Sequence, residues 1–395
     1  MAIFSSVIRG TDLARLNRLS FEVGPIRPPS EAFSLLIRAT RNCPWNRCEF
    51  CHTYKGKRFE YRGVEEVKGD ISKAKAVQEE IKELAWRLGY GGRTREVAGM
   101  LLQSPEVADG VRNMALWLYH GSRTVFLQDA NTLIMRTPEL AEVIRFLRET
   151  FPEVKRITSY ARSKTAAKKR VEELRELQEA GLSRLHIGLE SGARRVLEYM
   201  QKGVMPEEHV LGGRKVKEAG ISLCEYVMPG LGGKMLWQEH VVETARVLNE
   251  IDPDYIRLRS LHVVSDSPLH QKLLSGDFEP RSEDEVVEEI GQLIVRLNCH
   301  SQLMSDHILN LLPEVEGRLP EDKERMLGII ARYLSLPPDT RLNFVLGRRL
   351  GYYERLADLE NLHTYERVEQ LRRRIEREYE GGVEKALLAL KEGFV

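Results

Sequence analysis

Cysteine, net charge and long apolar runs are all scarce in this sequence of 395 residues. Only five cysteines are present, and this small odd number does not make a disulfide scaffold but fits a reducing compartment. The formal net charge of +1 argues against a broad nucleic-acid-binding surface. No window approaches the eighteen uninterrupted apolar residues of a membrane span, so we expect none.

The N-terminal stretch MAIFSSVIRGTDLARLNRLS lacks the apolar core of a secretory signal peptide, so the expected location is the cytoplasm. Hydrophobic residues make up 42% of the chain and charged residues 30%. This balance predicts a packed globular core rather than long disorder. The length suits one large domain together with a smaller one.

Short apolar strands alternate with helices through the middle of the chain. The pattern predicts six strands, which begin near Phe33, Thr124, Arg156, Arg184, Ser222 and Tyr255. Helices are expected over 11–19, 138–150, 168–180, 193–200, 206–219 and 237–250, and the region 64–119 is expected to be helical with a Gly-rich break at Gly89-Tyr-Gly-Gly. Strands separated by helices pair in parallel through right-handed crossovers. The predicted fold is therefore α/β, a partial (βα)6 TIM-like barrel that falls short of the eight units of a closed barrel.

The strand signal ends near residue 275, where we expect a domain boundary. Beyond it the pattern predicts helices over 282–298, 303–312, 320–334 and 338–349, and a charged helix over 364–391. The predicted organisation is an N-terminal extension over 1–32, the barrel over 33–275 and an α-helical C-terminal domain over 276–395.

Three of the five cysteines lie within nine residues, Cys43-Pro-Trp-Asn-Arg-Cys48-Glu-Phe-Cys51, directly after the first predicted strand. Thiolates are soft ligands that select zinc, copper(I) or iron–sulfur clusters. Three thiolates can hold three irons of a four-iron, four-sulfur cluster and leave the fourth iron open to another ligand. Strand ends are also where parallel α/β folds place their chemistry.

A zinc knuckle is the alternative interpretation of the cysteine loop, with the adjacent His52 or the distant His262 or His300 as fourth ligand. Structural zinc sites usually pair two knuckles, and the second pair is missing here, so the loop favours a cluster. Under the zinc interpretation the protein is a binding module whose helical C-terminal region contacts partners. Cys224 and Cys299 are too few for a second four-iron cluster, although Cys224 could face the barrel cavity in a thiol role.

The cysteine loop, with the aromatic Phe50 just before its last cysteine, resembles that of the radical S-adenosylmethionine superfamily. The usual spacing there is three residues and then two, whereas this loop has four and then two, as after a one-residue insertion. Gly188-Leu-Glu-Ser-Gly, followed by Val196-Leu-Glu-Tyr-Met-Gln-Lys-Gly, resembles the fourth-strand segment of one branch, and Tyr226-Val-Met-Pro-Gly-Leu-Gly-Gly resembles its fifth-strand segment. That branch includes oxygen-independent coproporphyrinogen oxidases, Elongator-type catalytic subunits and methylthiotransferases. The resemblance covers about residues 33–270.

The resemblance implies a set of cofactor ligands. Cys43, Cys48 and Cys51 would hold a [4Fe–4S] cluster whose open iron chelates S-adenosylmethionine. Gln128, Asp129 and Ala130 stand where such proteins carry a Gly-Gly-Glu-like stretch, so backbone carbonyls and Asp129 would hold the methionine amine. Phe50, Glu190 and Met228 would also lie at the cofactor, although Glu190 could instead cap the next helix, since carboxylates favour helix N-termini.

Two residues at the end of the third strand are further candidates. Ser159 and Arg162 could bind the ribose and the methionine carboxylate, since arginine offers a bidentate fork. The alternative for Arg162 is a surface arginine near a helix start. In the helical region, Asp306 or His307 could reach the substrate.

The resemblance also implies an activity. One electron delivered through the cluster would cleave S-adenosylmethionine to a 5′-deoxyadenosyl radical, which abstracts hydrogen from an unidentified small-molecule or lipid-like substrate. Methyl or methylthio transfer is the less favoured reaction, because no second cysteine cluster is present. A one-electron donor such as a ferredoxin or flavodoxin is expected as a partner. A nucleic-acid partner is not expected, given the near-neutral charge.

Overall fold

The computed structural model describes residues 8–392, which cluster into two compact units, each assembled from separate stretches of the chain. Unit 1 contains the chain up to Pro44 together with Gly56–His186 and Lys215–Ser222. Unit 2 contains Trp45–Lys55, Ile187–Arg214 and the chain from Leu223 onward. The division between the two units falls inside the cysteine loop, between Pro44 and Trp45. Each unit is therefore described by itself.

Unit 1 contains most of the helices and strands of the first half of the chain. These are α1 (Gly10–Arg18), η1 (Pro29–Glu31), β1 (Leu35–Arg38), β2 (Thr40–Arg41), β3 (Glu60–Tyr61), α2 (Val64–Arg87), α3 (Thr94–Gln103), α4 (Asp109–Tyr119), β4 (Thr124–Gln128), η2 (Thr132–Ile134), α5 (Thr137–Thr150), β5 (Arg156–Ala161), α6 (Ser163–Lys168) and α7 (Val171–Ala180). Strand β6 (Leu182–Glu190) and helix α9 (Pro206–Glu218) each contribute residues to both units, and Ser222, the first residue of the following strand, also belongs to unit 1.

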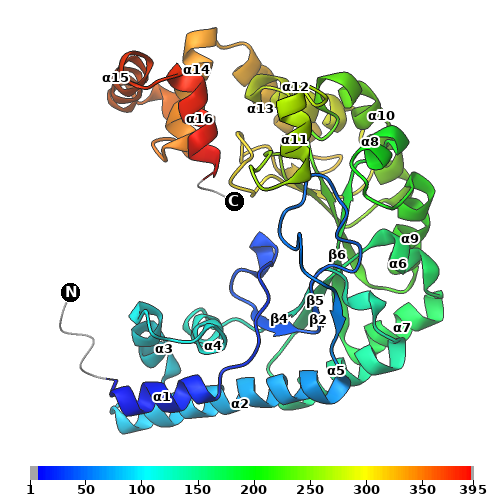
Figure 1. Ribbon diagram of the computed structural model, residues 1–395, viewed down its shortest axis with the longest axis vertical. Helices are drawn as coiled ribbons and strands as arrows, with labels where there is room; N and C mark the ends of the chain where they lie inside the picture. Colours follow the sequence, from blue (N-terminus) through cyan, green and yellow to red (C-terminus); the bar gives the residue numbers. More distant parts are fainter. Residues whose placement is uncertain (1–7, 393–395) are drawn as a thin grey trace. The chain divides into compact units, whose positions relative to one another are not determined.

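The strands of unit 1 pair in parallel, as the alternation of strands and helices predicts. Leu36 on β1 lies opposite Phe126 on β4, and Phe126 lies opposite Thr158 on β5. The long helix α2 packs against α5, and α5 packs against α7. Helix α1 runs beside α2 in Figure 1, and Arg15 on α1 pairs with the buried Glu80 on α2 at 2.7 Å.

Unit 2 contains the later strands and the C-terminal helices. Its elements are α8 (Arg194–Tyr199), β7 (Ser222–Val227), α10 (Gly233–Ile251), β8 (Tyr255–Leu258), α11 (Pro268–Ser275), α12 (Glu283–Arg296), β9 (Gln302–Met304), β10 (Gly317–Arg318), α13 (Lys323–Leu334), α14 (Pro338–Arg349), η3 (Leu356–Glu360), α15 (Leu362–Glu378) and α16 (Gly382–Glu392). Strands β7, β8 and β9 are parallel neighbours, and β10 is antiparallel to β9.

The predicted α/β fold is confirmed. Within residues 8–392 the strand order of the main sheet is β1-β4-β5-β6-β7-β8-β9-β10, and β2 and β3 form a separate antiparallel pair. The first six strands of this order are the six that the sequence predicts. Two predicted helix ends are also confirmed, because α7 stops at Gly181 and α9 is followed by Gly220, both with positive φ. Positive φ favours glycine.

Four helix predictions are wrong in detail. The region expected to be helical over 64–119 is three helices, α2, α3 and α4, because a second break over 104–108 adds to the one at Gly89-Tyr-Gly-Gly. The segment expected as a helix over 303–312 instead contains the end of β9 and an irregular loop, which Asn310 fastens by bonds to Ser260 and to the Leu258 carbonyl. The charged helix over 364–391 is two helices, α15 and α16, separated at Gly381 and Gly382, which have φ of 93° and 63°. The helix over 168–180 begins only at Val171, after the separate short helix α6.

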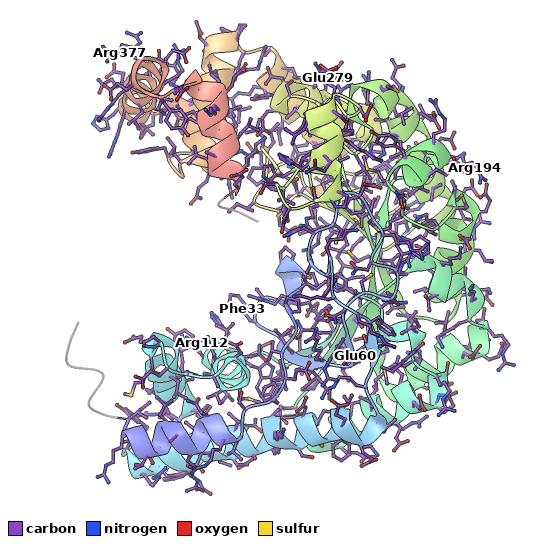
Figure 2. All side chains as sticks on the ribbon, viewed as in Figure 1. Phe33, Glu60, Arg112, Arg194, Glu279 and Arg377 are labelled. Carbon is purple, nitrogen blue, oxygen red and sulfur yellow. The ribbon has the colours of Figure 1, made fainter. Side chains whose placement is uncertain are left out.

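The C-terminal helices are more exposed than the strands. The side chains of α15, where Figure 2 labels Arg377, are largely exposed, and Val368 is its buried residue.

Among the helices between residues 8 and 392, none combines the length and the hydropathy that a membrane crossing needs. The boundary expected near residue 275 stays a prediction, as do the 1–32 extension and the domain limits built on that boundary.

Candidate functional site

In unit 1, the buried carboxylate of Asp129 holds the start of the cysteine loop. Asp129 is fully buried just after β4, and its Oδ2 accepts hydrogen bonds from Arg38 Nη2 at 2.7 Å and from the backbone N–H of Asn42 at 2.9 Å. Asn42 has φ of 66° and donates from its side chain to the Arg58 carbonyl at 2.6 Å. Asp129 therefore fixes the chain immediately before Cys43.

In unit 2 the rest of the loop is fastened to the segment that follows α8. Trp45 Nε1 donates to the Gln201 carbonyl at 2.7 Å. The Glu49 N–H donates to the Met200 carbonyl at 2.9 Å, and the Glu49 carbonyl accepts from the Leu269 N–H at 2.9 Å. The backbone around Cys48 and Cys51 is thus held on both sides although it contains no helix or strand.

The three loop cysteines have half-buried side chains, whereas Cys224 and Cys299 are buried. The backbone N–H of Cys51 donates to the Cys48 carbonyl at 3.3 Å, so these two lie in one turn of unit 2, while Cys43 belongs to unit 1. In the described part of the chain, no three His, Cys, Asp or Glu side chains are gathered to hold a metal ion. Three accessible soft donors on one loop nevertheless have the chemistry that suits an iron–sulfur cluster. The ligand set stays a prediction.

Glu190 sits in a tight turn at the end of β6. Its φ is 62°, and the N–H of Ser191 donates to the Leu189 carbonyl at 2.8 Å. Its carboxylate pairs with Lys202 at 3.0 Å, and both side chains are nearly buried, at 12% and 13% exposed. A Cβ on Gly188 would collide with both of these charged groups, so the glycine makes room for the pair.

Lys202 also connects Glu190 to the cysteine loop within unit 2. Its ammonium lies 5.6 Å from the centroid of the Phe50 ring, close enough for a cation–π interaction. Phe50 packs against an apolar cluster that includes Met228, and the Met228 N–H donates to the Glu190 carbonyl at 3.0 Å. Three residues that the resemblance places at the cofactor, Phe50, Glu190 and Met228, are therefore brought together, and Lys202 contacts the first two.

Glu225 on β7 is a second carboxyl close to this group. It is fully buried and neither of its oxygens has a hydrogen-bond partner. Burial raises its pKa well above the usual range, the Glu190 charge raises this pKa further, and Lys202 opposes the shift. Burial therefore favours the protonated form of Glu225.

The other candidates of unit 1 have local structural partners. Gln128 is fully buried. Its side-chain oxygen accepts a hydrogen bond from the Gly24 N–H, and its side-chain nitrogen donates to the Gly24 and Ile26 carbonyls. Ser159, also buried, bonds the Leu127 carbonyl at 2.8 Å and the Thr132 hydroxyl. The side chain of Gln128 and the hydroxyl of Ser159 thus help to hold β4 and β5 in place, and their roles toward a cofactor stay predictions.

Two further candidates flank these strands. Ala130 is half-buried and follows Asp129 directly. Arg162, half-buried at the start of α6, donates its backbone N–H to Asn131 at 3.1 Å. The helix start that the alternative interpretation of Arg162 requires is therefore present, and the cofactor contacts of Ala130 and Arg162 stay predictions.

Sequence reasoning missed Lys202 and Arg38. Lys202 lies 12 positions after Glu190, and Arg38 lies 91 positions before Asp129, so no helical or strand period links either pair. A sequence signal existed only for Lys202, because it follows the Glu190 segment within Val196-Leu-Glu-Tyr-Met-Gln-Lys-Gly, a stretch that resembles the same family segment. Nothing in the sequence identified Arg38 as the partner of Asp129.

Comparison with known proteins gives one extended match. The family model for the radical SAM superfamily matches residues 37–246, which is more than half of the chain. A curated relative, the tRNA uridine(34) acetyltransferase of Methanocaldococcus infernus, is 22% identical over 120 residues, which are 30% of this chain and 22% of the relative. Its counterpart from Methanocaldococcus jannaschii is 21% identical over 120 residues and is likewise covered over 22% of its length. The chain thus spans about a fifth of the length of these relatives.

Two solved structures illustrate the structural similarities. Methylornithine synthase (PylB) is 13% identical, with a TM-score of 0.41 and coverage of 92% of this chain and 100% of that one. The methyltransferase TsrM from Kitasatospora setae, solved with cobalamin and a [4Fe-4S] cluster bound, is 12% identical, with a TM-score of 0.44 and coverage of 90% and 67%.

Proposed function

This chain belongs to the radical S-adenosylmethionine superfamily of enzymes, and we propose that it cleaves S-adenosylmethionine and abstracts a hydrogen atom from an organic substrate. Membership implies a [4Fe–4S] cluster and S-adenosylmethionine as cofactors. The observation that carries the proposal is the family match over residues 37–246, which includes the cysteine loop, the Glu190 turn and β7.

Under this proposal Cys43, Cys48 and Cys51 hold the cluster. The bound cluster would pass on one electron from an external donor for cleavage of a carbon–sulfur bond of S-adenosylmethionine, which would give methionine and a 5′-deoxyadenosyl radical. The protein's own part is to hold the loop. Asp129 fixes its start through Arg38 and Asn42.

Lys202 and Glu190 are proposed to bind the charged end of the cofactor. Lys202 carries a nearly buried ammonium beside Phe50, which directly precedes Cys51. An ammonium in that position would attract the carboxylate of the methionine moiety, and the carboxylate of Glu190 would attract its amine. The Gln128–Ala130 backbone, Ser159, Arg162 and Met228 complete the proposed set.

The substrate, the reductant and the location are proposed more coarsely. We favour a small-molecule or lipid-like substrate, a ferredoxin or flavodoxin as electron donor, and the cytoplasm. The tRNA in the names of the curated relatives is not transferred to this chain, because the match covers only 22% of their length.

The proposal is tested by the metal content of the protein. Protein purified and reconstituted without oxygen is expected to be brown and to hold about four irons per chain. The Cys48→Ala variant should lose this iron, whereas Cys299→Ala, a change at a buried cysteine outside the motif, should retain it. A colourless protein that takes up zinc instead would support the binding-module alternative and contradict the proposal.

A further inference from the structure

Strands β7, β8 and β9 of unit 2 present polar side chains on one shared face. Arg257 on β8 lies opposite Tyr226 on one side and Met304 on the other. Because side chains two apart on a strand point to the same face, Cys224 shares this face with Tyr226. The ladder extends one residue beyond β8, where the Arg259 N–H donates to the Val227 carbonyl at 2.9 Å, so Arg259 continues the face of Arg257.

Arg257 has a hydrogen-bond donor to spare although it is buried. Only 4% of the residue is exposed, and its Nη1 donates to Asp306 at 2.7 Å. The Cys224 thiol is a second partner. The Nε–H of Arg257, however, has no acceptor. A buried donor without a partner is costly, so an acceptor bound at this position would be stabilised.

His307 offers another donor close to these arginines. Its Nδ1 accepts a hydrogen bond from the Leu309 N–H at 3.3 Å, which leaves the proton of the neutral ring on Nε2. Burial and the charges of Arg259, Arg257 and Arg349 lower the pKa of His307 to about 4. The ring is therefore neutral at pH 7, in an environment of positive charge.

Arg259 is the source of the uncompensated charge. Arg257 is paired with Asp306, whereas Arg349 and Lys391 share the single carboxylate of Glu283. Within residues 8–392 the exposed Arg259 side chain has neither an ion pair nor a hydrogen bond. Positive charge around His307 thus exceeds negative charge, and the unpaired charge of Arg259 lies at the carboxyl end of a parallel strand, where such sheets bind their ligands.

We propose that Arg257, Arg259 and His307 bind an oxyanion of the substrate, either a carboxylate or a phosphate group. The bound molecule is the hydrogen donor of the radical reaction, so this part of the inference rests on the proposed function. Arg259 provides the charge and a planar fork that matches an oxyanion, and Arg257 Nε–H and His307 Nε2–H provide further donors. The substrate class is therefore an anionic organic molecule.

The experiment follows the His307 ring by NMR in protein labelled at histidine, reconstituted without oxygen and not reduced. The His307→Gln variant identifies the resonance, and inorganic phosphate and acetate are the two probes. Either probe should shift the resonance saturably. Stronger binding of phosphate would indicate a phosphate group, and stronger binding of acetate a carboxylate.

Two variants separate site binding from general charge effects. Arg259→Gln should weaken the apparent affinity for the better probe about tenfold, since it removes the unpaired charge. Arg296→Gln is the control, because Arg296 is an exposed arginine that bonds its own helix at Gln292, and its affinity should not change. Binding that is equally tight in Arg259→Gln and the unsubstituted protein would overturn the inference, as would the lack of a saturable shift with both probes.

This titration and the test of the proposed function can fail separately. Anion binding is measured before reduction and needs no cleavage of S-adenosylmethionine. Protein that forms 5′-deoxyadenosine but binds neither probe would retain the proposed function and overturn the oxyanion site. Protein that binds a probe through Arg259 but forms no 5′-deoxyadenosine would retain an anion site and overturn its assignment to a radical substrate.

Discussion

The ammonium of Lys202 lies 3.0 Å from the carboxylate of Glu190 and joins the turn after β6 to the segment after α8. Both side chains are nearly buried and oppositely charged, and the Lys202 charge also lies over the Phe50 ring. A zwitterion such as the methionine end of S-adenosylmethionine could exchange partners with this pair without leaving a buried charge unpaired. Under the proposed function, the pair is the most specific candidate contact for the cofactor in unit 2.

Replacing Lys202 with methionine should weaken the binding of S-adenosylmethionine. The change removes a charged hydrogen-bond donor, whose loss typically costs about 1.5–3 kcal/mol, so the affinity should fall by roughly tenfold or more. Equilibrium dialysis with the reconstituted protein measures this affinity. Lys202→Arg keeps the charge and should lose less. Lys234→Met, at an exposed lysine paired with Glu279, is the matched control, and equal losses at Lys202 and Lys234 would contradict the assignment.

Alanine substitutions at Gly188 and Gly192 should affect different properties, cofactor affinity at Gly188 and stability at Gly192. A Cβ at Gly192 would collide with the backbone of Glu243 and Thr244, which cannot easily move, so Gly192→Ala should lower the free energy of unfolding by about 1–3 kcal/mol. A Cβ at Gly188 meets only the ends of Glu190 and Lys202, so Gly188→Ala should cost less stability but weaken cofactor binding. Urea denaturation and dialysis measure the two effects. A Gly188→Ala protein with unchanged affinity would show that the pair does not contact the cofactor.

The stability difference between Glu225→Gln and the unsubstituted protein should depend on pH. The pKa of Glu225 is raised by folding, so the folded state binds this proton more tightly than the unfolded state. The stability contributed by the proton is present below the unfolded pKa and is lost as pH rises toward the folded pKa. Glu225→Gln should therefore resemble the unsubstituted protein at pH 4.5 and be more stable than it at pH 8. Urea midpoints at the two pH values test this, with Glu65→Gln as an exposed control, and a difference that does not change with pH would refute it.

Asp129→Asn should both destabilise unit 1 and reduce cluster retention. Asp129 is fully buried against Arg38, and breaking a buried ion pair from one side costs about 3–5 kcal/mol. The same change weakens the bond to the Asn42 N–H that fixes the chain before Cys43. Urea denaturation and iron analysis after reconstitution are the measurements. If Asp129→Asn unfolds like the unsubstituted protein and holds the same iron, the buried carboxylate does not support the loop.

The alternation of strands and helices could be predicted because each strand is a short apolar run, whereas in each helix the apolar residues recur with the helical period. Strands β9 and β10 could not, since three and two residues are too short to show alternation. The wrong helix over 303–312 has helix-like apolar spacing, but the Asn310 side chain bonds the backbone of Leu258 and Ser260 and stabilises a loop instead. The adjacent glycines Gly381 and Gly382 are the sequence signal for the break between α15 and α16.

The candidate site could be predicted where the chemistry lies within one short motif. The cysteine loop, Phe50 and the Glu190 segment are of this kind. The pairings of Asp129 with Arg38 and of Glu190 with Lys202 could not be predicted, because they depend on which strand ends the fold brings together. The unpartnered carboxyl of Glu225 and the spare donor of Arg257 follow from burial, which residue type alone does not reveal.

The most direct test of the account is the formation of 5′-deoxyadenosine. Protein reconstituted without oxygen is reduced with dithionite and mixed with S-adenosylmethionine, alongside the Cys43→Ala, Cys48→Ala and Cys51→Ala variants and the Cys299→Ala control. We predict that the unsubstituted protein and the control form 5′-deoxyadenosine and that the three loop variants do not. A loop variant that still cleaves S-adenosylmethionine, or unsubstituted protein that never does, would contradict the account.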